Sequence, residues 1–456
     1  MLKTFIINND ELEDHLYPNL YRYKKKVREF SERNDIFSFI LGDDGVIEVL
    51  SDGEHAGQVF VKSGAKFIKN SSVKRYVISE YDGFYITHEK NDTLLRSQLE
   101  KDDVLFTTIG KYLGVAAVVN ENIVGGNINQ NVVRLRINRK FVSPQYLAYF
   151  LNSKIARYQI DGLFTGNTHP ILTYPKLKSL KIFLKDRKTH DSVTKNALLA
   201  EKYSIDGLNK IDEAKKLFLD SLKIDFSKIT NQLHYSISHA EFNSNDIITP
   251  QFYRPLYMNT IEAIKKKHKW KSLGSIADFK SGDEVGSVNY KLYLGREETD
   301  VPFIRTTDLI NYEIDRYPDF YIENDIYTDI SQKIRVNEIL FSKDGKIGLT
   351  GMITESDKCI LGSGILRIIA NEAEIDPYYL FVALSIEQVG LYQAMQRTVV
   401  ASTLPHLRID RISEFIIPLL DNEKEISKLA EDGFALKEKS KSLIDKSRLI
   451  IEDSFE

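Results

Sequence analysis

The sequence predicts an α+β protein made of two similar domains in a pseudo-two-fold arrangement, separated by a pair of long antiparallel coiled-coil helices. Three observations predict this fold. The second half of the chain repeats the first, short β-branched and aromatic runs alternate with turns in each half, and each half ends in a charged stretch with heptad spacing. The 456 residues are enough for about two to four domains.

The internal repeat consists of seven blocks that recur in the same order, each 233 to 236 residues further along the chain. Two unrelated domains with common strand and turn patterns are the alternative explanation, but such domains would not keep a nearly constant offset. We therefore expect a duplication. The paired blocks are LYPNLY with FYRPLY, KFIKNSSV with PFIRTTDL, DVLFTTIGKYLG with EILFSKDGKIGL, NVVRLRI with GILRII, SPQYLAYFL with DPYYLFVAL, THPIL with TLPHL, and KLKSLKIFL with RISEFIIPL.

Each copy contains runs typical of strands, such as GQVFVKSG, NVVRLRI and VPFIRTT, bounded by turn residues. One helix is expected in each copy, from Ser143 in the first and from Asp376 in the second. Both residues are good N-caps, and a proline follows each of them at the first helical position. This mixture predicts a curved mixed sheet with a helix in each copy.

Two long helices are predicted from the spacing of apolar residues. Leucine or isoleucine recurs every seven residues in the second stretch, where Gly433, Ser440 and Ser447 occupy the companion column. Small residues on one column let two helices approach closely, whereas an ordinary amphipathic helix covering its own domain is the alternative. A helix of about 30 residues spans roughly 45 Å, more than one turn of duplex DNA at about 34–36 Å. The packing residues expected are Leu208, Ile211, Phe218, Leu222, Leu429, Leu436, Leu443 and Ile450.

These patterns predict the division of the chain. The first domain covers 1–188, the first spacer helix 189–222, a polar connector 223–245, the second domain 246–420, and the second spacer helix 421–456.

Composition restricts the function classes. The net charge is −3, so nucleic-acid binding would depend on local Lys and Arg patches instead of a global positive field. Cys359 is the single cysteine, which excludes an intramolecular disulfide and fits a reducing, cytoplasmic location. No run of 18 apolar residues is present, so no membrane-spanning helix is expected.

A Gly-Lys turn occurs in both copies, as Gly110-Lys111 and Gly345-Lys346. In the second copy, Asp344 precedes it, and together with Asp319 and Lys346 this gives the outline of a metal-dependent nuclease site. The first copy has Ile109 where the second has Asp344. Because the copies share the apolar strand, the glycine and the lysine, the repeat favours a strand–turn–strand unit with a projecting lysine. The nuclease remains the alternative function.

Other catalytic motifs are missing from the sequence. There is no GxxxxGK[ST] loop, no Gly-x-Ser-x-Gly elbow and no ligand-spaced histidine cluster, and no metal site is expected. Asp376-Pro377-Tyr378-Tyr379 lacks the second proline of an adenine-methyltransferase motif. These absences predict a chain that binds and does not catalyse.

The whole pattern resembles the specificity subunit of type I restriction–modification systems. The motifs that carry the resemblance are FYRPLY, SLGSIADFKSG, VPFIRTTDL, EILFSKDGKIG, LGSGILRI, the helix from Pro377, and STLPHLRIDRISEFIIPLLDNEKEI, with weaker versions in the first copy. The resemblance covers nearly the whole chain. It implies that each domain is a target-recognition domain that reads one half of a bipartite, asymmetric sequence in double-stranded DNA.

The resemblance also implies partners. The paired helices would set the gap between the half-sites and dock two methyltransferase subunits, and restriction/translocase subunits would complete the complex. S-adenosylmethionine, ATP and Mg²⁺ would belong to those partners, with no cofactor and no catalytic residue in this chain. Two other possibilities stay open: a related system in which methylase and nuclease share one polypeptide, and a scaffold without DNA contact.

The expected DNA contacts follow from side-chain chemistry. Cations bind phosphates, whereas amide, hydroxyl and imidazole groups read base edges. The phosphate candidates are Lys111 and Lys346, then Lys69, Arg305 and Lys343. The candidates in polar loops are Asn127, Asn129, Gln130, Thr165, Asn167, Thr168, Thr306, Ser402, Thr403 and His406.

Overall fold

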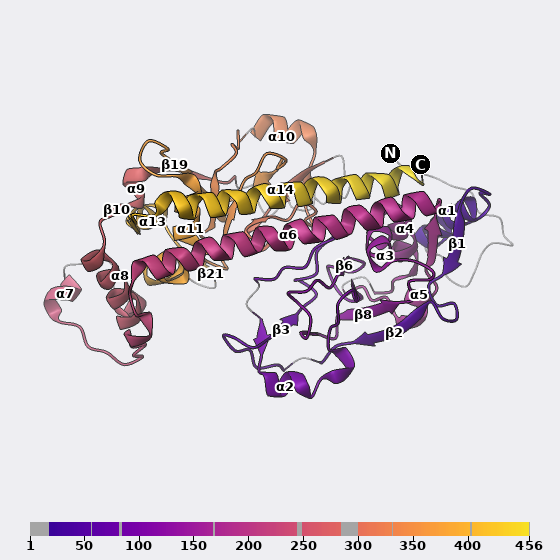
Figure 1. Ribbon diagram of the computed structural model, residues 1–456, viewed down its shortest axis with the longest axis horizontal. Coiled ribbons are helices and arrows are strands. Elements are labelled where there is room, and N and C mark those ends of the chain that lie inside the picture. Colours follow the sequence, from indigo (N-terminus) through magenta and orange to yellow (C-terminus); the bar gives the residue numbers. More distant parts are fainter. Residues whose placement is uncertain are drawn as a thin grey trace. The chain divides into compact units, whose positions relative to one another are not determined.

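The structure is a computed structural model that describes residues 18–55, 57–81, 84–166, 169–243, 249–283, 300–330, 332–401 and 404–455. The chain divides into two compact units, of which the first contains residues 1–202 and 439–456 and the second residues 203–438. The boundary therefore falls inside both long helices, α6 (Arg187–Leu222) and α14 (Glu423–Asp453) (Figure 1). The predicted subdivision into domains, spacers and connector stays a prediction.

The described residues of the first unit form three sheets. A four-stranded antiparallel sheet has the order β2-β8-β5-β6, a three-stranded mixed sheet the order β4-β3-β7, and β1 pairs with β9. Its strands are β1 (Phe37–Ile40), β2 (Ile47–Asp52), β3 (Ala65–Ile68), β4 (Tyr85–Ile86), β5 (Val104–Thr107), β6 (Ala116–Val118), β7 (Asn127–Ile128), β8 (Val132–Ile137) and β9 (Lys181–Leu184). Its shorter helices are α1 (Pro18–Ser31), α2 (His88–Asp92), α3 (Pro144–Leu151), α4 (Lys154–Leu163) and α5 (Tyr174–Lys178).

The second unit repeats this topology strand for strand. Its four-stranded sheet has the order β11-β19-β16-β17, its three-stranded sheet the order β15-β12-β18, and β10 pairs with β22. The corresponding strands are β10 (Trp270–Ser272), β11 (Ala277–Ser281), β12 (Val301–Ile304), β15 (Tyr321–Ile322), β16 (Ile339–Ser342), β17 (Thr350–Met352), β18 (Ile360–Leu361), β19 (Ile365–Ala370) and β22 (Ile416–Pro418). Two additional hairpins are β13 (Leu309–Ile310) with β14 (Glu313–Ile314) and β20 (Val399–Ala401) with β21 (Leu404–His406). The helices are α7 (His239–Asn243), α8 (Pro255–Lys267), α9 (Leu273–Ile276), α10 (Asn324–Ile330), α11 (Pro377–Ser385), α12 (Tyr392–Arg397) and α13 (Ile409–Ser413). The matching sheets confirm the α+β class.

The strands that carry the Gly-Lys turns are the centre of each core. All four residues of β5 are buried, and so are all four of β16. Strand β5 lies between β8 and β6, and strand β16 lies between β19 and β17, so neither has a solvated edge. Both turns are thus anchored on rigid, fully paired strands.

The predicted helix starts are confirmed. The Ser143 hydroxyl accepts a hydrogen bond from the Tyr146 amide at 3.1 Å, and the Asp376 carboxylate accepts from the amides of Tyr378 and Tyr379 at 2.8 and 3.2 Å. A proline occupies the first turn of α3 and of α11. The N-cap and proline signals therefore fixed both boundaries.

The long helices pair in the antiparallel sense, as predicted. Within the second unit, Asn422 donates to the Ser221 hydroxyl at 2.8 Å, while Gly207 lies against Gly433. Within the first unit, the Ser440 hydroxyl donates to the Ala200 carbonyl at 2.7 Å. The 36 residues of α6 correspond to about 54 Å of helix.

The small-residue column of α14, and not its leucine column, forms the close contact. Gly433, Ser440 and Ser447 are buried. A Cβ added to Gly207 would lie 2.7 Å from the Gly433 carbonyl oxygen, so the two backbones touch. The predicted packing residues of α6, namely Leu208, Ile211, Phe218 and Leu222, are all buried, whereas Leu429, Leu436, Leu443 and Ile450 of α14 are half-buried.

One acidic residue on α6 makes the first unit sensitive to pH. Burial, and then the negative charge of Asp102, raise the pKa of Glu201 to about 7 from an ordinary 4.5. The folded state therefore binds more protons than the unfolded state between pH 4.5 and about 7, and stability falls as the pH rises through this window.

Glu201→Gln is expected to remove this pH dependence. The variant should match the parent near pH 4 and exceed its unfolding free energy at pH 8 by on the order of 2 kcal/mol. Urea unfolding at both pH values measures the effect, and the exposed Glu213 of the same helix supplies Glu213→Gln as control. Equal pH profiles for parent and Glu201→Gln would contradict the assignment.

None of the helices in the described ranges is long and apolar enough to cross a membrane.

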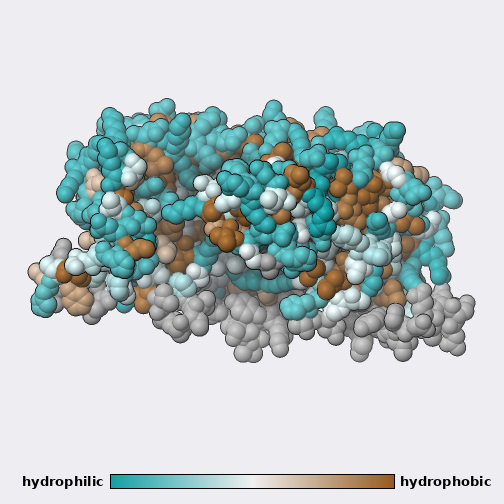
Figure 2. Space-filling model, turned by 90° about the horizontal axis from the view of Figure 1, so that it is seen from below, coloured by the Kyte–Doolittle hydropathy of each residue, from teal (hydrophilic) through white to brown (hydrophobic). Residues whose placement is uncertain are grey.

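On the face drawn in Figure 2, hydrophilic residues are interspersed with hydrophobic ones over most of the coloured surface.

Candidate nucleic-acid interface

The Gly-Lys turn has the same geometry in both units. Gly110 has a φ of 87° and Gly345 a φ of 68°, in the left-handed region that glycine adopts without a steric penalty. Lys111 and Lys346 follow directly, and both are exposed. The glycine thus lets the chain reverse at the end of a buried strand and leaves a cation on the surface.

A downstream segment docks on this turn in each unit. In the first unit, the Gly110 amide donates to the Pro170 carbonyl at 2.9 Å, and the Leu172 amide to the Thr108 carbonyl at 2.9 Å. In the second unit, the corresponding bonds run from Gly345 to Pro405 at 3.1 Å and from Leu407 to Lys343 at 2.9 Å. The turn and its docked segment therefore form one continuous surface.

This docking brings several predicted DNA contacts together. The segment that docks on the Lys111 turn begins at Thr165, which is exposed and exchanges two backbone hydrogen bonds with Ile171. His406 lies on the segment that docks beside Lys346. Asn167, Thr168, Ser402 and Thr403 belong to the same two segments but lie outside the described residues.

In each unit, a third segment reaches the turn. This segment follows strand β3 in the first unit and strand β12 in the second. An ideal Cβ on Gly110 would lie 3.9 Å from Asn70 Nδ2, and one on Gly345 would lie 4.0 Å from Thr306 Oγ1. Thr306 was predicted, whereas Asn70 was missed. The repeat contains the signal for Asn70, because the offset of 236 residues that relates Phe67 to Phe303 also relates Asn70 to Thr306.

Lys343 and Asp344 form part of a charge cluster. The Lys343 ammonium lies 3.0 Å from Asp344 Oδ2, and His406 Nδ1 is hydrogen-bonded to Asp344 Oδ1. Lys343 is 8% exposed. Its ammonium is paired with a carboxylate in this conformation, and its phosphate contact stays a prediction.

Lys69 and Arg305 occupy equivalent positions and pack on equivalent aromatic rings. The Lys69 ammonium lies 3.6 Å from the centroid of Phe84, and the Arg305 guanidinium 4.3 Å from that of Phe320. Arg305 also binds Asp308 and Asp319.

Burial opposes the charge of Arg305, but Asp308 and Asp319 outweigh it and raise the guanidinium pKa. Both cations therefore fix the loop beside the turn, and a phosphate contact remains a prediction for each.

The structure contradicts the predicted base contact of Asn127. Its side chain is fully buried and donates to Asn91 Oδ1 at 3.2 Å and to the Leu94 carbonyl at 3.1 Å, while its oxygen accepts from the Ser97 hydroxyl at 2.6 Å. It holds α2 and the following turn onto β7, and cannot reach a base edge. A polar residue in a Gly-Asn-Ile context gave no hint of this burial.

Asn129 and Gln130 remain candidates. Both are half-buried, and their side-chain oxygens make no hydrogen bond within the described residues. A buried amide oxygen without a partner is costly, and a bound ligand or water would satisfy it.

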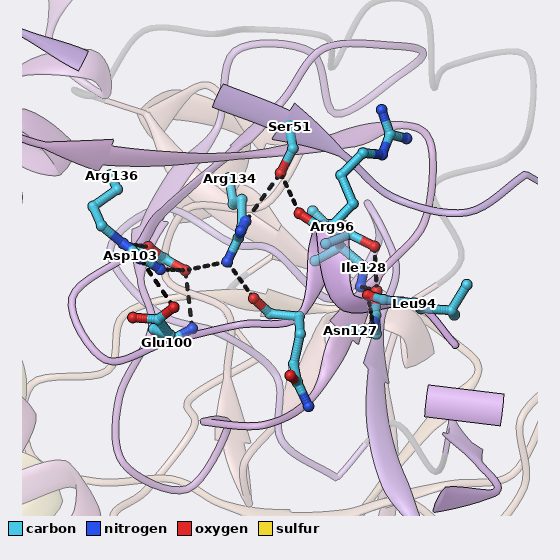
Figure 3. A network of polar contacts seen from close by, with 11 residues as sticks. Ser51, Leu94, Arg96, Glu100, Asp103, Asn127, Ile128, Arg134 and Arg136 are labelled. Carbon is cyan, nitrogen blue, oxygen red and sulfur yellow. Dashed lines mark hydrogen bonds and ion pairs between the residues drawn. The ribbon is translucent and has the colours of Figure 1, made fainter. Parts of the chain in front are cut away.

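The sequence analysis missed a buried ion pair at the start of the strand that leads to each turn. In the first unit, Asp103 accepts from Arg134 at 3.3 Å and from Arg136 at 3.0 and 3.2 Å, and Ser51 accepts from Arg134 at 2.9 Å (Figure 3). The hydrogen bonds to Asp103 raise the pKa of Arg136. Burial lowers this pKa, but the hydrogen bonds outweigh it.

The second unit has Glu338 and Arg367 at the same places in the sheet. Arg367 donates to both carboxylate oxygens of Glu338 at 2.7 and 2.8 Å, and to the carbonyls of Gln332 and Lys333. The side chains are 3% and 2% exposed. The repeat offsets of 235 for the acid and 233 for the arginine could have identified this pair.

The nuclease alternative is not supported by these contacts. The Asp319 carboxylate accepts from Arg305, and the Asp344 carboxylate accepts from Lys343 and His406. Within the ranges that the structure describes, no group of three or more His, Cys, Asp or Glu side chains could hold a metal ion.

The second half of the chain matches a known protein family. Residues 265–442, which cover most of the second unit, match the family model described as the type I restriction modification DNA specificity domain. Among solved structures, the chain is similar to a type I restriction-modification S subunit from M. genitalium (15% identity, TM-score 0.34, covering 93% of this chain and 96% of that one). It is also similar to the HsdS subunit from Thermoanaerobacter tengcongensis (15% identity, TM-score 0.27, covering 92% and 97%). The comparison with curated protein sequences found no match.

Proposed function

We propose, on the premise that residues 265–442 form a type I restriction–modification DNA specificity domain, that each unit of this chain reads one half of a bipartite, asymmetric DNA site. The observation that carries the proposal is this family match, and the repeated topology extends it to the first unit. The Gly-Lys turn and its docked segment form the recognition surface in both units.

The roles of the side chains follow from their positions. Lys111 and Lys346 are exposed beside a backbone that is fixed by hydrogen bonds to a central strand, so each can neutralise a phosphate in a defined place. Thr165 and His406 would face the base edges, and the base contacts of Asn167, Thr168, Ser402 and Thr403 stay predictions from the sequence. Phosphate contacts would then set the register, and the docked segments would supply the sequence preference.

The helices α6 and α14 would set the gap between the half-sites. Their antiparallel contact brings the two backbones together at Gly207 and Gly433, within the second unit. The remaining helix surface would dock two methyltransferase subunits, and restriction/translocase subunits would join that complex. Adenine methylation, ATP use and Mg²⁺ binding would belong to these partners, and this chain would contribute no catalytic residue.

Lys111→Ala and Lys346→Ala should each weaken DNA binding with little change in sequence preference. Each lost phosphate contact is expected to reduce the slope of log K against log salt by about 1. The measurement is a salt titration of DNA binding by the chain in complex with methyltransferase subunits. Lys140→Ala is the matched control, because Lys140 is exposed beyond the opposite end of β8 from the turn. Unchanged slopes for both turn variants would remove these lysines from the interface.

Mapping of modified bases in the host genome tests the function as a whole. The expected result is one two-part sequence with a fixed gap, methylated on both halves and lost when the chain is deleted. Methylation that persists without the chain, or the absence of any two-part motif, would refute the proposal.

A further inference from the structure

One backbone bridge beside the Gly-Lys turn has opposite chemistry in the two units. In the first unit, Ile109 pairs with Ile171 in an isolated antiparallel bridge, and in the second unit, Asp344 pairs with His406 in the same way. Both members are related by an offset of 235 residues. The backbone is therefore duplicated while an apolar pair is exchanged for an acid–imidazole pair.

Ile171 and His406, the downstream residues of the two bridges, are accessible to solvent. Ile171 is 38% exposed, and the side chain of His406 is 48% exposed. They lie on the segments that hydrogen-bond to the Gly110 and Gly345 turns, next to Lys111 and Lys346. Whatever approaches the two lysines therefore meets an apolar methyl surface in one unit and an imidazole in the other.

The second unit holds its imidazole in a defined orientation. Asp344 binds His406 through Nδ1 and is itself fixed by Lys343 on its other oxygen. A nitrogen that donates to a carboxylate must carry the proton, so Nε2 is the ring nitrogen left for another molecule. Where the second unit has Lys343, the first has the buried Thr108, whose hydroxyl donates to the Asn131 carbonyl.

We propose that this bridge is a specificity-determining position, at which Ile171 contacts a thymine methyl group in one half-site and His406 hydrogen-bonds a base edge in the other. Asp344 is a positioning residue, because it orients the ring without facing the base. In the major groove the thymine methyl is the apolar group, and the remaining base-edge groups are hydrogen-bond donors and acceptors. The inference rests on the proposed function and adds what distinguishes the two half-sites.

The first arm of the test uses base analogues. Full-length chain in complex with methyltransferase subunits is bound to its mapped site, in which each thymine of the first half-site is replaced in turn by deoxyuridine, which lacks only the methyl group. One replacement should weaken binding to the parent about tenfold and leave binding to Ile171→Ala unchanged. No effect of any replacement, or a first half-site without thymine, would overturn the role of Ile171.

The second arm uses a DNA library randomised in both half-sites. The double variant D344I/H406I, which installs the pair of the first unit, should lose its preference at one position of the second half-site by about tenfold and keep the preferences of the first half-site. His406→Asn, with a smaller polar group, supplies the same readout if the double variant does not assemble. Asp344→Asn, which keeps an acceptor for the ring, should retain the base preference at lower affinity.

The outcomes separate the two proposals. Site-specific binding with unchanged second-half preferences in D344I/H406I and in His406→Asn refutes the specificity position alone. A parent complex that binds all sequences equally refutes the proposed function itself.

Discussion

Arg367→Leu is expected to lower the free energy of unfolding by about 3–5 kcal/mol, the largest effect of any single substitution considered for this chain. The substitution leaves the Glu338 carboxylate, whose side chain is 2% exposed, without the guanidinium that binds both of its oxygens. It also removes the donors to the Gln332 and Lys333 carbonyls. Urea unfolding of the purified chain measures the loss.

The first unit supplies a matched control for this prediction. Arg134→Leu removes the equivalent arginine, but Asp103 there keeps two hydrogen bonds from Arg136. Its cost should be clearly smaller than that of Arg367→Leu. Removing both charges of the second unit in R367M/E338L should recover much of the lost stability, since no unpaired charge remains buried. An equal loss of unfolding free energy in Arg134→Leu and Arg367→Leu would show that the unpaired Glu338 carboxylate does not cause the loss of stability.

The same pair should affect DNA binding indirectly. Glu338 directly precedes β16, and the Gly345-Lys346 turn follows that strand. Loosening the strand is therefore expected to reduce affinity for DNA even in a variant that remains folded.

Gly207→Ala is expected to destabilise the helix pair by about 1–3 kcal/mol, although alanine has the higher helix propensity. An isolated helix would gain about 1 kcal/mol from this change. In the folded chain the new methyl group would lie 2.7 Å from the Gly433 carbonyl oxygen and 2.7 Å from Lys437 Cγ, so the backbones would have to separate. Overpacking of this kind typically costs about 1–3 kcal/mol.

Thermal unfolding of Gly207→Ala, Gly433→Ala and the double variant tests this contact. Gly433→Ala should behave alike, because its methyl group would lie 2.8 Å from the Gly207 carbonyl oxygen. The double variant should cost less than the sum of the two, since one separation of the helices relieves both clashes. Ser442→Ala, at an exposed position of α14, is the control and should be neutral or slightly stabilising. A rise in stability for Gly207→Ala would mean that the helices do not touch at this point.

The contact has a functional consequence under the proposed function. If the helices set the gap between the half-sites, pushing them apart at this contact would alter that gap. In a complex containing Gly207→Ala, methylation of sites with the native gap should therefore decrease more than methylation of either half-site alone.

The repeat predicted more of the fold than any single motif did. A nearly constant offset between seven blocks implies that both copies form the same contacts, and the strand orders match in the three sheets that the two units share. The N-caps at Ser143 and Asp376 and the Gly-Lys turns were also predictable, because caps and turns depend on neighbours within about four residues. The candidate site was found through these local signals.

Burial was predicted less well. Asn127 and Lys343 both looked like surface residues, but Asn127 is enclosed by Asn91, Leu94 and Ser97, and Lys343 is held by Asp344. The buried pairs Asp103–Arg134 and Glu338–Arg367 were not predicted from the sequence. For Asn127 and for both buried pairs, the deciding partner lies about 30 or more residues away in the sequence, whereas for Lys343 it is the adjacent Asp344.

By itself, the sequence determined the duplication, the class of fold, the two long helices and the place of the Gly-Lys turn, since these follow from repeated spacing and short-range chemistry. Only the tertiary structure decided which polar side chains face outward, which column of α14 meets α6, and that the bridge beside the turn carries isoleucines in one unit and an aspartate–histidine pair in the other. The physical reason is that burial and pairing are properties of contacts between distant segments, and a residue's own type constrains them only weakly.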